Sequence, residues 1–358
     1  MIKNNLLNKI VKIIKIYKIY IILYIILFTI ILCYSYYKNY KNNKEHFDTP
    51  KFKTLISNWD NGSGFYSELS FKLNHYLYCK KYNINFKTNS NNWPYKFKNG
   101  WTDYFEDVEL KLNDDLNNNN PDLIHTENGC CTILEKFKLK DYVNAVKEYY
   151  VYNSEVKQII EDKKKEIGLI NGEYGCIYIR RGDKLIDEIE FTHTDKFIDK
   201  LLNVYPNCKT IFLQTDDYNC FIELQNYIKN KNLDIKSLTL CPETNFGAIA
   251  HNGWTDRMKE NKSGNQEYLE KIKNNLSKPI SEMTPEEKYD HTIELITSVD
   301  ICIHSKICVC DYRSNVSRFI KVAHNNVMNV FDVGEADKLF DLESYKSIGW
   351  DLDSSHNL

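Results

Sequence analysis

The sequence has almost no net charge, because its 47 lysines and arginines are balanced by 49 aspartates and glutamates, which gives a formal charge of −2 over 358 residues. Bulk electrostatics therefore offers no argument for binding nucleic acid. Cys-x-x-Cys elements are also lacking, although the chain has 11 cysteines, which disfavours a structural zinc site. Hydrophobic residues make up 42% of the chain, enough for the core of one large or two medium domains.

Spacing does not determine how the cysteines pair. Cys308 and Cys310 alternate with Ile307 and Val309 in a predicted strand. Buried thiols are the simplest interpretation of that pattern. The aromatic residues of segment 93–105 are likewise expected to pack in the core.

Residues 19–37 contain no charged side chain and are dominated by Ile, Leu and Tyr. This is close to the roughly 20 residues that a helix needs to span the hydrocarbon layer. Lysines precede the run, and the first acidic residue is Glu45, which favours a cytoplasmic N-terminus. A cleaved signal peptide is the alternative, but the run is long for one and lacks a small-x-small cleavage site. We expect a retained anchor, a single-pass type II membrane protein, and residues 38–358 in the Golgi or endoplasmic reticulum lumen.

Three apolar runs each end in a cluster of polar residues, and each run is typical of a short buried strand. The runs are residues 176–179, 210–213 and 307–310, followed by clusters 180–184, 214–217 and 311–318. In a parallel sheet the three clusters would lie along one edge, where open α/β sheets bind their ligands. Adjacent arginines such as Arg180 and Arg181 favour a bidentate grip on phosphate. Ser314 and Asn315 are good N-cap residues, and a helix N-terminus attracts anions.

Strands and helices alternate through the second half of the chain, which predicts a doubly wound parallel sheet. The predicted strands are residues 176–179, 210–213, 307–310 and 327–331. The predicted helices are residues 134–152, 155–167, 195–204, 218–230, 285–299 and 315–325, and a long irregular segment covers 241–283.

In this order and setting the three clusters resemble the three motifs of the α1,6-fucosyltransferase superfamily, over roughly residues 57–332. The first, Arg180-Arg181-Gly182-Asp183-Lys184, is the most specific of them. The resemblance implies a GT-B fold, in which two Rossmann-like domains face each other and the C-terminal one binds GDP-fucose. It further implies inversion of configuration and no metal or other cofactor. The partners would be the nucleotide-sugar donor, a glycan or glycoprotein acceptor and the membrane, and not nucleic acid.

The resemblance also implies a division of the chain and a role for each matching residue. The divisions are a basic cytoplasmic tail (1–18), the anchor (19–37), a stem (38–56), an acceptor-side Rossmann-like domain (57–168), the nucleotide-sugar-binding domain (169–340) and a tail (341–358). The donor-binding residues are Arg180, Arg181, Asp183, Lys184, Asp216, Asp217, Ser314, Asn315 and Arg318. Arg181 is expected to grip the β-phosphate and Glu188 to act as the base, so these two are the predicted catalytic residues.

The sequence departs from the family where Tyr178 stands in place of a frequent histidine, and where Arg313 stands in place of a small residue. Glu294 matches an acidic residue of the family only loosely. Asp216 and Asp217 could instead form a turn and a helix cap, and Arg180 and Arg181 could instead form structural ion pairs with Asp183 or Asp187. A transferase using another nucleotide sugar and a non-catalytic, membrane-anchored glycan-binding protein stay open as alternatives. An Asp-x-Asp pair occurs only in the C-terminal tail, at Asp351 and Asp353, which favours chemistry without a metal.

Overall fold

The computed structural model describes residues 53–59, 64–111, 123–125 (backbone only), 137–169, 173–185, 191–247 and 278–334, with Phe28, Thr29 and Tyr34. The chain divides into two compact units, Met1–Lys53 and Thr54–Leu358. Apart from Phe28, Thr29 and Tyr34, the predicted anchor lies outside the described residues. Within the described part of the chain, no helix has the length and apolar character to cross a membrane.

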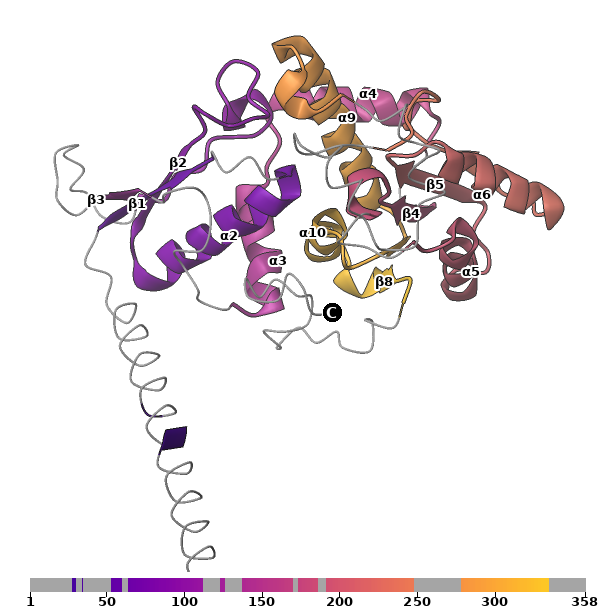
Figure 1. The fold of residues 1–358 in the computed structure, drawn as a ribbon, viewed down its shortest axis with the longest axis horizontal. Coiled ribbons are helices and arrows are strands. Elements are labelled where there is room, and N and C mark those ends of the chain that lie inside the picture. The colour runs from indigo at the N-terminus through magenta and orange to yellow at the C-terminus, as the bar shows by residue number, and fades with distance from the viewer. Residues whose placement is uncertain are drawn as a thin grey trace, which may run out of the picture. The chain divides into compact units, whose positions relative to one another are not determined.

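The second unit begins with a small parallel sheet in the order β2-β1-β3. Its strands are β1 (Thr54–Asn58), β2 (Asn85–Asn89) and β3 (Leu123–His125), and its helices are α2 (Phe65–Tyr82) and α3 (Leu139–Tyr149) (Figure 1). The sequence predicted neither β1 nor β2, because each mixes polar and apolar residues without a continuous apolar run. β1 starts at Thr54, so the last residues of the predicted stem belong to a strand.

Aromatic side chains fill the core beside this sheet. Trp101 stacks on Phe105 with ring centroids 4.0 Å apart, and on Trp59 at 5.0 Å. Trp93 and Tyr104 are buried as well. The expectation of a core cluster in segment 93–105 is confirmed. Helix α2 continues the aromatic contacts, because Tyr66 lies 4.7 Å from the ring of Phe319 on another helix, α10 (Asn315–Ala323).

The larger sheet has five parallel strands in the order β6-β5-β4-β7-β8. The strands are β4 (Gly175–Ile179), β5 (Thr210–Thr215), β6 (Lys236–Leu238), β7 (Ile307–Cys310) and β8 (Val330–Asp332). The further helices are α4 (Ser154–Glu166), α5 (Thr194–Val204), α6 (Asn219–Asn230) and α9 (Pro285–Ile303), with 3₁₀ turns η3 (Gly182–Leu185) and η5 (Val327–Asn329). Figure 1 shows α5 and α6 on one side of this sheet and α9 and α10 on the other. The other predicted strands and helices of this half are confirmed with small shifts at their ends, but the predicted strand 327–331 begins only at Val330, because Val327–Asn329 form η5. β6 was not predicted.

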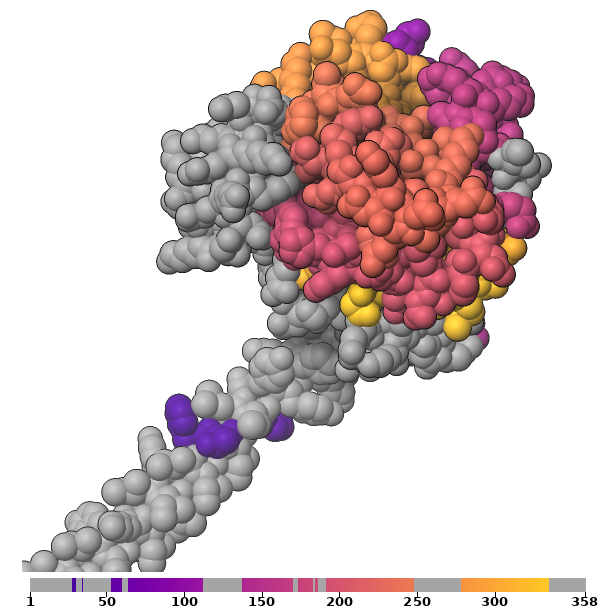
Figure 2. Space-filling view, turned by 90° about the vertical axis from the view of Figure 1, so that its right-hand side faces the viewer, coloured from indigo at the N-terminus to yellow at the C-terminus, as the bar shows by residue number. Residues whose placement is uncertain are grey.

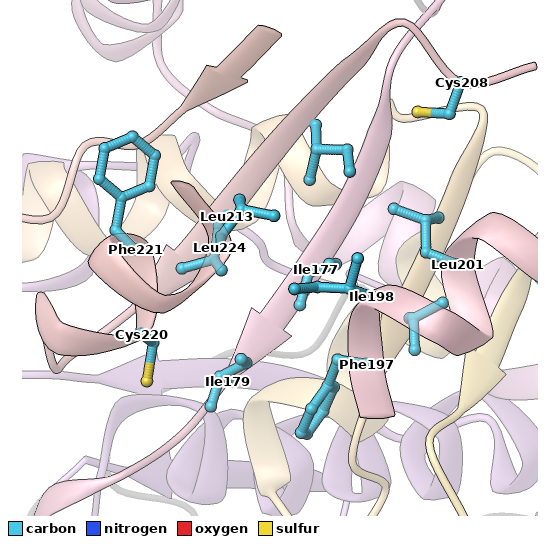
Figure 3. Packing of buried hydrophobic residues seen from close by; sticks show 12 residues of the cluster. Ile177, Ile179, Phe197, Ile198, Leu201, Cys208, Leu213, Cys220, Phe221 and Leu224 are labelled. Atoms are coloured by element: carbon cyan, nitrogen blue, oxygen red, sulfur yellow. The ribbon is translucent and has the colours of Figure 1, made fainter. Parts of the chain in front are cut away.

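Alternation along β4 places its side chains on two different faces. Ile177 and Ile179 pack with Phe197 and Leu201 of α5 and with Leu224 of α6 (Figure 3). Because side chains alternate along a strand, the other residues of β4, Cys176 and Tyr178, belong to the opposite face of the sheet. Figure 2 shows the molecule from the side on which α6 lies.

Helix α9 begins where its sequence predicts. Thr284 caps it by accepting a hydrogen bond from the Glu287 amide at 3.2 Å, and Glu287 accepts one from the Thr284 amide at 2.7 Å. This reciprocal pair is a capping box, and Pro285 occupies the first helical position, where its missing N–H costs nothing.

A buried ion cluster connects the other end of α9 to α4. Lys164 Nζ lies 2.7 Å from Asp300 Oδ2, and His304 Nδ1 lies 3.2 Å from the same oxygen. Burial alone would raise the pKa of Asp300, but hydrogen bonding and charge from His304 and Lys164 outweigh it and lower that pKa. The hydrogen bond to Asp300 raises the pKa of His304. Asp300 is thus held ionised in the interior by two partners.

Candidate functional site

The order of the five strands identifies the edge of the sheet where a ligand would bind. From β4 the chain proceeds outward through β5 and β6, and then returns to the other side of β4 to form β7 and β8. β4 and β7 are therefore the adjacent strands at which the strand order reverses. Open α/β sheets bind ligands outside the carboxyl ends of the strands at such a point. The predicted polar clusters follow β4, β5 and β7, so they do lie along one edge.

Asp216 ties the ends of β4 and β5 together. Its carboxylate pairs with the guanidinium of Arg180 and accepts a hydrogen bond from the Arg181 backbone amide at 2.7 Å. The side chains of Arg180 and Asp216 are 13% and 14% exposed, so both reach solvent. The alternative of structural ion pairing expected Asp183 or Asp187 as a partner, whereas the structure pairs Arg180 with Asp216; the side chains of Asp183 and Asp187 lie outside the described part of the chain.

Arg181 is directed into the protein. Its guanidinium lies 4.4 Å from the centre of the Phe191 ring, and its Nη2 donates a 2.6 Å hydrogen bond to the Thr192 carbonyl. Only 2% of the residue is exposed. It continues the side of β4 on which Ile179 packs against α5 and α6, whereas Arg180 continues the opposite side. The role of Arg181 at the β-phosphate stays a prediction, and the greater exposure of the neighbouring side chain favours Arg180 for contact with a ligand.

Asp217 forms a turn at the start of helix α6, whose N-cap residue is Tyr218. The Asp217 Oδ1 accepts hydrogen bonds from the Asn219 backbone amide at 3.0 Å and from Asn219 Nδ2 at 2.8 Å, and the residue is 1% exposed. The turn alternative therefore describes Asp217, whereas contact of Asp216 with a donor stays a prediction.

The third cluster forms the N-terminus of α10, as predicted, with Ser314 as the N-cap residue. The hydroxyl of Ser314 is hydrogen-bonded to Tyr178, whose pKa burial raises to about 12. Arg318 Nε donates to the Tyr312 carbonyl at 2.7 Å, and its Nη1 reaches Asn315 Oδ1 at 3.4 Å. The structure therefore brings Ser314, Asn315 and Arg318 together at the start of α10, where Ser314 and Arg318 are both buried and Arg318 supports the loop through the Tyr312 carbonyl.

Arg313, which departs from the family pattern, also lies at this edge. Its Nε is 2.9 Å and 3.1 Å from the two carboxylate oxygens of Asp311, and its Nη2 is 3.4 Å from Thr192 Oγ1. Arg181 and Arg313 thus hold Thr192 from two different loops. The sequence did not predict this shared contact, because the three residues are far apart along the chain.

Helix α9 carries two titratable residues with shifted pKa values, His291 and Glu294. Burial, and then the charge of Arg180, lower the pKa of His291. Burial raises the pKa of Glu294 to about 7, against the charge of Lys163. The sequence drew attention to Glu294 but missed His291. Their spacing of three residues on a predicted helix was the available signal.

Two predicted residues remain without a described side chain. Glu188 lies outside the described residues, and of Asp183 only the backbone, within η3, is described. Lys184 lies in the same turn, which begins with Gly182 at a φ of 56°, a conformation that favours glycine. In the described ranges, no three His, Cys, Asp or Glu residues are arranged to hold a metal ion.

No protein-family model and no curated protein matches the chain. Solved structures do, and 22 chains match. One is NodZ α-1,6-fucosyltransferase soaked with GDP-fucose, with 9% identity and a TM-score of 0.48, covering 76% of this chain and 93% of that one. Another is fucosyltransferase NodZ from Bradyrhizobium, with 9% identity and a TM-score of 0.44, covering 76% and 94%. Both of these structures are described as fucosyltransferases.

Proposed function

We propose that this chain is a fucosyltransferase-like glycosyltransferase of the GT-B type that moves fucose from GDP-fucose to a glycan hydroxyl with inversion. The observation that carries the proposal is the position of Arg180. It is a solvent-reaching arginine at the carboxyl edge where the strand order reverses, in the same sheet edge as the N-terminus of α10. A cation and a helix N-terminus together suit a diphosphate.

The proposed roles follow from what each group contacts. Arg180 grips the diphosphate, and Asp216 fixes the guanidinium in place. Arg181 positions the loop through Phe191 and Thr192. As the bond to fucose breaks, the departing GDP gains negative charge, which fixed positive groups stabilise more strongly than they stabilise the intact donor. Glu188 is proposed to accept the proton of the acceptor hydroxyl.

A screen of nucleotides and nucleotide sugars tests this proposal. GDP and GDP-fucose are expected to raise the melting temperature, and GDP-fucose is expected to be hydrolysed slowly without an acceptor. A shift with another nucleotide sugar alone would assign a different transferase. Binding of a glycan without any donor hydrolysis would favour the non-catalytic glycan-binding alternative.

We expect the reaction to survive chelation, because arginine and the helix N-terminus can carry the leaving-group charge without a cation. Donor hydrolysis would be measured after dialysis against EDTA, with and without added Mn²⁺. Equal rates are the expected result. Activity abolished by EDTA and restored by Mn²⁺ would contradict the proposed chemistry.

We also propose that the chain is a single-pass type II protein with residues 38–358 in the lumen, because lysines precede the apolar segment. Sequons occur at Asn61, Asn261, Asn275 and Asn315. The first three are expected to carry glycans where exposed, and Asn315 to be protected at the donor site. Endoglycosidase treatment should therefore shift the protein on a gel. No shift, together with cleavage of the domain by protease added to the cytosolic side, would refute this topology.

A further inference from the structure

Four cysteines gather in the interior of the larger sheet. They are Cys176 of β4, Cys302 of α9, and Cys308 and Cys310 of β7, and all four are fully buried. Cys176 and Cys308 are direct partners in the parallel register of β4 and β7. The cluster belongs to the side of β4 opposite Ile177 and Ile179, so it is separate from the core shown in Figure 3.

Within the cluster, the sulfur atoms of Cys176 and Cys302 are 3.0 Å apart. An S–S bond is about 2.05 Å long, so a small movement of the two side chains would bring the sulfurs to bonding distance. The two residues are 126 positions apart in the sequence, and they meet only because α9 packs on β4. Cys308 and Cys310 share one strand and the same face, where a bond between them is not feasible.

Hydrogen bonds within the cluster shift the pKa values of its thiols in opposite directions. Burial alone would raise the pKa of Cys302, but hydrogen bonds from Cys176 and Cys308 outweigh it and lower that pKa. Burial raises the pKa of Cys176 well above its ordinary value. Although several thiols meet here, the described residues include no group arranged to hold a metal ion.

We propose that Cys176 and Cys302 form a disulfide when the chain folds in an oxidising compartment, and that Cys308 remains a thiol. A glutathione disulfide or a protein disulfide serves as the oxidant. One of the two cysteines, as its thiolate, attacks one sulfur of this oxidant and releases one thiolate, which leaves a mixed disulfide on that cysteine. The other cysteine then loses its proton and attacks the cysteine sulfur of the mixed disulfide, which expels the second thiolate. Two cysteine thiols are oxidised and one external disulfide is reduced to two thiols. Because both cysteines are buried in the folded protein, the bond forms during folding.

The cross-link would connect two elements that build the candidate site. β4 leads directly into Arg180, and α9 carries His291 and Glu294. Joining them at Cys176 and Cys302 restricts how far the helix can move from the strand. The bond would also close a long loop, and disulfides that close long loops stabilise a fold mainly by constraining the unfolded chain.

Peptide mapping of the full chain, produced through a eukaryotic secretory pathway, tests the proposal. The protein is denatured in acid with an alkylating reagent and no reductant, then digested and analysed by mass spectrometry. The expected result is a linked pair of peptides containing Cys176 and Cys302, with Cys308 alkylated. Full alkylation of Cys176 and Cys302, or a link from either of them to another cysteine, would overturn the proposal.

Matched alanine variants distinguish the stabilisation that comes from the disulfide from the stabilisation that comes from packing a buried cysteine side chain. In Cys308→Ala the linked peptides should persist, whereas in Cys176→Ala they should disappear and Cys302 should be alkylated. Folding in the presence of dithiothreitol should lower the melting temperature of the wild-type chain by about 5 °C and that of Cys308→Ala by the same amount. The reductant should have no such effect in Cys176→Ala. An equal effect of the reductant in all three proteins would assign the stabilisation to other cysteines and contradict the proposal.

Discussion

Replacing Arg180 with lysine is expected to lower turnover by on the order of 10²-fold, comparable to the loss of one strong transition-state donor. Lysine keeps the positive charge and can still pair with Asp216, but it lacks the planar fork that holds two phosphate oxygens at once. The lost interaction gains importance as the leaving group becomes charged. Turnover of GDP-fucose would be measured on purified protein, with circular dichroism as the test of folding.

Arg181→Lys is the matched control, because it is the same substitution one residue away. The Arg181 guanidinium is buried against Phe191 and bonded to the Thr192 carbonyl. Its replacement should reduce the free energy of unfolding by about 2 kcal/mol, the range for a hydrogen bond to a charged group. Arg180→Lys should leave stability nearly unchanged. Normal turnover in a folded Arg180→Lys protein would refute the proposed position of the donor diphosphate.

Glu188→Gln gives the contrasting result within the same experiment. The amide is similar in size to the carboxylate but cannot accept the proton of the acceptor hydroxyl. Donor binding should be retained and transfer reduced, whereas Arg180→Lys should weaken both. Unchanged transfer in Glu188→Gln would remove Glu188 as the base without affecting the assignment of Arg180.

Replacing Asp300 with alanine is expected to lower the free energy of unfolding by about 3 kcal/mol. Removing one member of a buried ion pair leaves the other charge without compensation, which is more costly than the loss of the attraction alone. Asp300 has a side chain only 4% exposed and pairs with both Lys164 and His304. Without it, Lys164 keeps Glu161 as a partner, and the Glu161 side chain is 56% exposed. Urea unfolding followed by circular dichroism would measure the change.

Lys165→Ala provides the control for this experiment. Lys165 neighbours Lys164 on α4, but its side chain is 72% exposed and pairs with an exposed aspartate. Surface pairs of this kind contribute little, so a change below about 0.5 kcal/mol is expected. Equal, small effects of the two substitutions would show that the Asp300 cluster does not hold α4 to α9.

Much of the larger sheet could be predicted from the sequence. The apolar runs that became β4, β5 and β7 are continuous and buried on both faces, which is a strong local signal. Helix α9 was predicted at 285–299, and the capping interactions of Thr284, Pro285 and Glu287 that fix its start span only a few residues. The polar clusters after the three strands lie along one edge because parallel strands end on the same side. By contrast, β1, β2 and β6 have mixed sequences, and only pairing with neighbouring strands defines them.

The sequence by itself determined that arginines, aspartates and a helix N-terminus follow buried parallel strands, because these features depend on local periodicity and capping. Only the tertiary structure decided which of two consecutive arginines reaches solvent. α5 and α6 bury one side of β4, so Arg181 is enclosed on that side while Arg180 emerges on the other. The meeting of Cys176 with Cys302, and of Lys164 with Asp300, was likewise decided by the packing of α9 on β4 and α4. Contacts between residues so far apart in the chain leave no periodic signal, because they depend on how whole elements pack rather than on local sequence.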